Sequence, residues 1–145
     1  MTDKELWDKY AAENDVRDAE YEAWAFGGDP DLLAELVKDG IKTATASAYP
    51  LYEIEGEPLP EAGEYSVIRD SGDEAVCIIR TKRVYVAPFK EVSAEHAYKE
   101  GEGDRSLEYW RKVHEEFFAE CMEEAGLAFT PDMDVVCEEF EVVYK

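Results

Sequence analysis

Apolar residues in the first 40 positions recur at helical spacing and predict three helices. Leu6 and Trp7 fall on one face of a first helix over 3–14. A second helical pattern covers 19–26 and is stopped by two glycines. A third helix begins with an Asp-Pro pair, an N-cap followed by a proline in the first turn, and ends at Gly40.

Beyond this point the pattern changes to the two-residue alternation of β-strands. Hydroxyl and methyl side chains alternate over 43–47, so that one face carries three hydroxyl groups. Two further strands, 64–69 and 75–86, are separated by an Asp-Ser-Gly-Asp turn and are expected to pair as a hairpin. A last strand is predicted over 135–144.

One long helix separates the hairpin from the last strand. Its apolar face runs from Leu107 to Ala125, and Gly126 ends it. Asp104 and Ser106 are both capable of capping its first turn. Asp104 is the preferred cap, and its loss is expected to cost about 1 kcal/mol of stability.

The order of these elements sets the fold class. Helices come first, then strands, one long helix and a final strand, whereas a parallel doubly wound sheet needs strands that alternate with helices. The sequence therefore predicts an α+β fold with a mainly antiparallel sheet that curls into a small β-barrel with flanking helices. At 145 residues, with no repeat and no linker, the chain is expected to form a single domain over 1–145.

The net charge of the chain limits the classes of partner that it is expected to bind. The chain has 15 basic and 36 acidic residues, a net charge of -21. Such a field disfavours duplex DNA, since phosphates are bound by lysines and arginines, but it is compatible with a small nucleoside or nucleotide, or a short single-stranded RNA, in a local pocket. No apolar run has the length of a membrane span and the N-terminus lacks an apolar signal core, so we expect no membrane partner and a cytoplasmic protein with reduced cysteines.

The turn Gly-Ile-Lys-Thr-Ala-Thr, which starts at Gly40, offers an amine and a hydroxyl. Lys42 becomes a useful base only if burial lowers its pKa, and a solvated lysine beside a helix C-terminus is the simpler interpretation. Thr45 needs a base to act as a nucleophile, and threonine is also an ordinary strand residue. Side chains three apart in a strand point to opposite faces, so Lys42 and Thr45 meet only if Lys42 lies in the turn.

The acidic loop Glu-Gly-Glu-Gly-Asp, which starts at Glu100, is the second candidate. A calcium loop is rejected, because Arg105 and Arg111 stand where that motif needs glycine and glutamate. The remaining interpretations are solvation with a helix cap, or one carboxylate held in a pocket as a general acid. Glu102, between two glycines, is expected to be solvated. With His114 on an apolar helix face and only two histidines in the chain, a metal site is not expected.

These motifs together resemble the ASCH domain family. The resemblance rests on the turn at 40–45, on His-Ala-Tyr-Lys-Glu at 96–100 and on the run to Trp at 100–110. It covers about residues 20 to 145 and is greatest to a longer, bacterial branch, with 1–30 as a helical N-terminal extension. It implies a PUA-like fold.

The resemblance also implies an activity, known best from a shorter branch: hydrolysis of the acetyl amide of N(4)-acetylcytidine. Lys42 then takes the role of base, Thr45 of nucleophile and Glu100 of acid, with no cofactor; Glu100→Gln is expected to slow turnover with little effect on folding. The short branch has arginine where this chain has Ser47. An RNA- or nucleotide-binding module without catalysis, and a ribonuclease that uses the same pocket, remain alternatives. The candidate substrate-binding residues are Gly40, Thr43, Ser47, Tyr49, Arg69 and Glu102.

Overall fold

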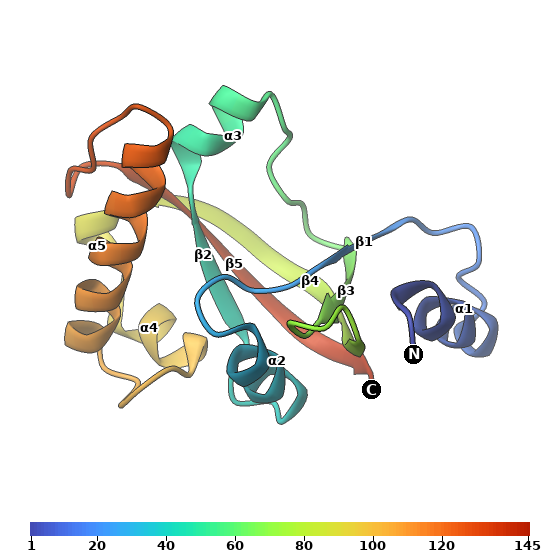
Figure 1. Ribbon diagram of the computed structural model, residues 1–145. Helices are drawn as coiled ribbons and strands as arrows, with labels where there is room; N and C mark the ends of the chain where they lie inside the picture. Colours follow the sequence, from blue (N-terminus) through green and yellow to red (C-terminus); the bar gives the residue numbers. More distant parts are fainter.

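The computed structural model describes residues 1–145 and contains one five-stranded sheet with the strand order β1-β3-β4-β5-β2 (Figure 1). The strands are β1 (Tyr21–Trp24), β2 (Ala44–Ala48), β3 (Tyr65–Arg69), β4 (Ala75–Pro88) and β5 (Asp134–Tyr144). Neighbouring strands are antiparallel except for β1 and β3, which are parallel. The α+β fold with a mainly antiparallel sheet is therefore confirmed, as is the β3–β4 hairpin.

The sheet does not close into the predicted barrel. Its edge strands β1 and β2 are short, with 4 and 5 residues, and they are not paired with each other. Instead, a cavity lies between them, lined by residues of both edge strands and of the three strands that connect them. The interior that a closed barrel would fill with side chains is thus a hollow on one side of an open sheet.

Helices flank this sheet at several places (Figure 1). They are α1 (Asp3–Asn14), α2 (Pro30–Lys38), α3 (Tyr49–Glu55), the 3-10 turn η1 (Phe89–Glu91), α4 (Ala94–Glu100) and α5 (Leu107–Glu124). Figure 1 shows α4 and α5 together at one end of the sheet and α1 at the other. No helix is both long enough and apolar enough to cross a bilayer.

One predicted element differs from the structure. Residues 19–26 do not form a helix, because Tyr21 to Trp24 pair with β3 as an edge strand. Their aromatic residues have high strand propensity, and Tyr21 stacks on Trp7 of α1 at a centroid distance of 4.8 Å. In addition, β2 is followed directly by the helix α3, which the sequence pattern did not predict and which has proline in its first turn.

The cap of α5 also differs from the prediction. The Ser106 side chain accepts a hydrogen bond from the Tyr109 backbone N–H at 3.1 Å and is the N-cap. Asp104 lies two residues earlier, where its Oδ1 accepts a hydrogen bond from the Ser106 backbone N–H at 2.9 Å. Asp104 therefore orients the loop before the cap rather than capping the helix.

The turn before β2 is fixed by backbone hydrogen bonds to three other elements. The N–H groups of Ile41 and Lys42 donate to the Leu36 carbonyl at 2.9 and 3.0 Å, which ties the turn to α2. The Thr43 N–H donates to the carbonyl of Lys99 in α4 at 2.7 Å, and the Thr43 carbonyl accepts from β5. These bonds place Lys42 beside the end of α4.

Close approach of the two segments depends on Gly101, which follows α4. Its φ of +72° lies in the left-handed region, and a methyl group added there would lie 2.6 Å from the Ile41 carbonyl oxygen. Any side chain at this position would push the end of α4 away from Lys42.

We expect Gly101→Ala to destabilise the protein more than Gly126→Ala. Gly126 has a similar φ of +75° with no atom within 4 Å of the added carbon, so both variants lose about 1–2 kcal/mol for the left-handed backbone. Only Gly101→Ala adds the clash with Ile41. Urea unfolding of both variants measures the difference; equal losses would contradict the tight contact between α4 and the turn.

Candidate functional site

Lys42 is buried at the junction of the turn and α4, with 1% of its surface exposed. Its Nζ donates to Glu100 Oε1 at 3.3 Å, to the Glu100 carbonyl at 3.4 Å and to Glu102 Oε2 at 2.9 Å. The residue lies before β2, in the turn, which is the condition for meeting Thr45. The solvated-lysine interpretation is therefore wrong: the ammonium is desolvated and its three hydrogens each face an oxygen.

Glu100 is the carboxylate at the centre of this cluster. It is 1% exposed and accepts hydrogen bonds from Lys42, from His96 Nε2 at 2.7 Å and from the Trp110 indole N–H, and it forms an ion pair with His114 Nε2 at 3.4 Å. Burial alone would raise the pKa of Glu100, but the charge of Lys42 and the hydrogen bonds from His114 and His96 outweigh it and hold this pKa well below its usual range. Glu100 is therefore an anion.

His114 carries a proton on both ring nitrogens in this arrangement. Its Nδ1 lies 2.9 Å from the Trp110 carbonyl, which only accepts, and its Nε2 faces the Glu100 carboxylate, which also only accepts. Burial alone would lower the pKa of His114, but the hydrogen bond and the charge of Glu100 outweigh it, so the pKa is raised. The imidazolium also stacks on the Trp110 ring at a centroid distance of 4.3 Å.

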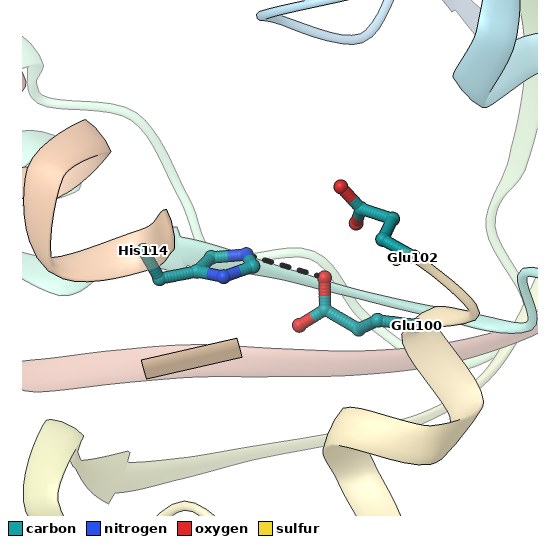
Figure 2. Close-up of side chains that lie close together, drawn as sticks. All are labelled: Glu100, Glu102 and His114. Carbon is teal, nitrogen blue, oxygen red and sulfur yellow. Dashed lines mark ion pairs between the residues drawn. The ribbon is translucent and has the colours of Figure 1, made fainter. Parts of the chain in front are cut away.

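Glu102 is the second carboxylate on Lys42. Its side chain is 21% exposed, so it is partly desolvated and ion-paired, not free in solvent as the flanking glycines suggested. Figure 2 shows His114 of α5 facing Glu100 at the end of α4, with Glu102 beside them in the next loop. Two cations, Lys42 and His114, balance the two carboxylates.

Three of these side chains have the donor set of a metal site. Ligand atoms of Glu100, Glu102 and His114 all lie within 4.8 Å of one another (Figure 2). The Lys42 ammonium, however, already lies between the two carboxylates and supplies the positive charge that an ion would supply. The geometry therefore describes an ion-pair network in which Lys42 takes the place of a cation.

The network forms one wall of a cavity of about 280 Å³. Lys42, Thr45 and Glu100 all line it, together with Glu102 and His114. The remaining wall is largely apolar and comes from α2, the segment before it and α5; it includes Phe26, Leu32, Leu33, Leu36, Val113 and Phe117. The amine, hydroxyl and carboxylate proposed from the sequence thus face a common space.

A larger cavity of about 750 Å³ is the hollow between the edge strands. Residues of β2, α5 and the segment after β1 line both cavities: Phe26, Gly27, Thr45, Ala46 and Phe117. The two cavities therefore adjoin along these residues, Thr45 among them, and together they are called the cleft.

The other predicted substrate-binding residues lie in different parts of the structure, and only some of them line the cleft. Ser47 lines the larger cavity and its hydroxyl hydrogen-bonds the Tyr52 hydroxyl at 2.8 Å. Gly40 and Thr43 line another hollow with Lys82 and Lys99, and Lys42 lies between this hollow and the cavity of about 280 Å³ because it lines both. Arg69 donates to the Ala23 carbonyl at 3.2 Å and links β3 to β1. Neither Arg69 nor Tyr49, at the start of α3, lines the cleft.

His114 and Glu138 line the cleft but were not predicted as site residues. His114 stands one helical turn after Trp110, and this spacing was the available signal that both reach the same carboxylate. Glu138 lies in the middle of β5, which also carries Asp134, Glu139 and Glu141, so no sequence signal sets it apart.

Comparison with known proteins supports the resemblance drawn from the sequence. The family model of the ASCH domain matches residues 22–144. The chain belongs to the ASCH domain family. An ASCH domain from Lactobacillus crispatus, known from a crystal structure, is 30% identical, with a TM-score of 0.93 over 98% of this chain and 94% of that one. A crystal structure of an Enterococcus faecalis protein is 36% identical, with a TM-score of 0.90 over 97% of this chain and 87% of that one.

The PUA-like fold expected of an ASCH domain is thereby confirmed, with an open sheet. A hypothetical protein with 22% identity and a TM-score of 0.56 shares the fold alone. No curated protein matches this ASCH domain. Strand β1 begins one residue before the matched range and lies otherwise within it, whereas α1 precedes it entirely.

We expect the His114 ring to titrate above its ordinary value of 6.5. Because the pKa of His114 is raised in the folded state, its contribution to stability is complete below about pH 6.5 and is lost as the pH rises through the folded-state pKa. The pKa of Glu100 is lowered, so its contribution is complete above about pH 4.5 and is lost as the pH falls through the folded-state pKa of Glu100. Ring resonances followed by NMR against pH report the pKa directly, with His114→Gln assigning the signals. A pKa below 6.5 would contradict the ion pair with Glu100.

We expect Glu100→Gln to lower the free energy of unfolding by about 3 kcal/mol, because it removes one partner of a buried ion pair. This revises the expectation of intact folding. Glu102→Gln is the matched control: Glu102 is 21% exposed, and its loss is expected to cost about 1 kcal/mol. Urea unfolding at neutral pH measures both, and a smaller loss for Glu100→Gln would show that Glu102 is the main partner of Lys42.

Proposed function

We propose that this ASCH domain hydrolyses an acyl amide on the base of a modified nucleoside, with N(4)-acetylcytidine as the model substrate. The observation that supports this function is the common cavity of Lys42, Thr45 and Glu100, in which a desolvated amine, a hydroxyl and two carboxylates face about 280 Å³ of space. Apolar walls suit an acyl group, and the adjoining larger cavity, which Thr45 also lines, offers space for the base.

The reaction begins with a proton transfer from Lys42 to a carboxylate. In the resting network Lys42 is an ammonium and has no lone pair to accept a proton. A substrate that displaces water favours the neutral forms of an ion pair, and Glu102, at 2.9 Å, accepts the proton. Glu100 stays ionised, because its donors hold its pKa well below the usual range.

Acyl transfer follows with Thr45 as the nucleophile. The neutral Lys42 amine takes the hydroxyl proton while the Thr45 oxygen bonds to the amide carbon. The carbon–nitrogen bond then breaks, and the protonated Glu102 delivers its proton to the leaving nitrogen. Lys42 is again an ammonium and Glu102 a carboxylate, with the acyl group as an ester on Thr45.

Water completes the cycle by the same route. Lys42 again passes a proton to Glu102 and accepts one from the attacking water, and Glu102 returns its proton to the Thr45 oxygen as the ester breaks.

Glu100 was the acid implied by family resemblance. Its four donors instead fit a positioning residue that holds Lys42, and the half-buried Glu102 fits the acid better.

A second candidate is a non-catalytic module that binds a nucleotide or a short single-stranded RNA. It is favoured by the completeness of the network, in which Lys42 and Glu100 are fully paired without a ligand. Such a module would use the cleft for recognition only.

We expect wild-type protein to release acetate and cytidine from N(4)-acetylcytidine, and Thr45→Ala and Lys42→Met to lose activity by about 10²-fold or more. Lys112→Met is the matched control, because Lys112 is an exposed residue of α5. Chromatography of the products measures turnover. Binding without release of acetate would support the second candidate, and cleavage of a short RNA that depends on Lys42 would indicate a ribonuclease.

A further inference from the structure

The larger part of the cleft contains an acidic side chain that the reaction above does not use. Glu138 stands on β5 directly opposite Thr45 of β2 in the antiparallel register. Side chains of such a pair lie on the same face with their Cβ atoms about 4.5–5.5 Å apart. Glu138 and Thr45 both line the cavity of about 750 Å³, so a ligand in contact with Thr45 also meets Glu138.

Glu138 differs from Glu100 in having no cationic partner. No ion pair of the structure includes it. Its Oε2 accepts a hydrogen bond from the Thr81 hydroxyl at 3.2 Å. Its Oε1 has no hydrogen-bond partner in the protein, and this oxygen is not fully buried. The carboxyl group therefore presents an unused acceptor to the cavity.

This placement of Glu138 is unfavourable for the stability of the folded protein. Burial raises the pKa of Glu138, the hydrogen bond from Thr81 opposes this rise without cancelling it, and the nearby charges of Glu64 and Glu22 add to it. A half-buried carboxyl without a cation costs stability and contributes little packing that an apolar side chain would not supply. The arrangement fits a group retained for a ligand.

We propose that Glu138 is the specificity residue of this site: its carboxyl group accepts the exocyclic N–H of an N-acylated base and so holds the amide carbonyl against Thr45. This inference rests on the proposed function and names its substrate class. The base lies in the larger cavity, near Ser47 and Tyr52, and the acyl group lies in the smaller one. Secondary amides of a nucleobase amino group fit, whereas N-methylated tertiary amides lack the donor.

Binding in a Thr45→Ala background tests this inference apart from catalysis. We expect Glu138→Leu to weaken binding of N(4)-acetylcytidine about tenfold or more, because a ligand N–H then stays unpaired. Glu141→Leu, an exposed position on the same strand, is expected to have no effect. The N(4)-methyl analogue of N(4)-acetylcytidine should bind weakly to the background protein and equally weakly to its Glu138→Leu variant.

Stability separates recognition from a structural role. Glu138→Leu is expected to keep or raise the urea midpoint, since it removes an unpaired carboxyl group, and Glu138→Gln, of the same shape, supplies a folded variant if leucine is not tolerated. Unchanged affinity in both variants, or equal affinity for the two ligands, would overturn the role of Glu138. If the wild-type protein hydrolyses N(4)-acetylcytidine while the Glu138 variants of the Thr45→Ala background bind it as tightly as that background, this inference alone is refuted. If binding depends on Glu138 but the wild-type protein shows no turnover, the hydrolase alone is refuted. If neither nucleoside binds, both are refuted.

Discussion

The buried ion pair between Lys42 and Glu100 is the interaction on which the rest of the site depends. It joins residues 58 positions apart in the chain and links the turn before β2 to the end of α4. Both groups are desolvated, so each is tolerable only while its partners are in place. The Glu100 carboxylate also accepts a hydrogen bond from Trp110 and forms an ion pair with His114. The Lys42–Glu100 pair therefore orients the beginning of α5 as well.

Two carboxylates on one lysine allow a division of roles. Glu100 is enclosed by donors and remains an anion, which fixes the position of Lys42. Glu102 shares the same ammonium but is 21% exposed and lines the cavity, so it is the carboxylate of this pair that a ligand can contact. An enclosed anion and a more accessible carboxylate thus meet at one amine. The open sheet provides the space beside them, because β1 and β2 stay apart.

Much of this arrangement was predictable from local patterns. The turn at Gly40, the hairpin and the long helix follow from glycine positions and hydrophobic spacing, whereas a shared site for Lys42 and Glu100 was indicated by the family resemblance. The parallel edge strand β1 was not, because its four residues become a strand only through β3, which lies about 40 positions later. The contacts of His114 and Glu102 were also hidden, since burial of a polar group depends on tertiary packing rather than on its neighbours in sequence.

The central claim is that Lys42 activates Thr45 as a nucleophile in a shared cavity. Its most direct test is the mass of the intact protein after rapid acid quenching of a reaction with N(4)-acetylcytidine, followed by peptide mapping. We predict a transient increase of one acetyl group located on Thr45 and absent from Lys42→Met. Acetate release without any acetylated protein, or an acetyl group on Lys42 itself, would contradict this account.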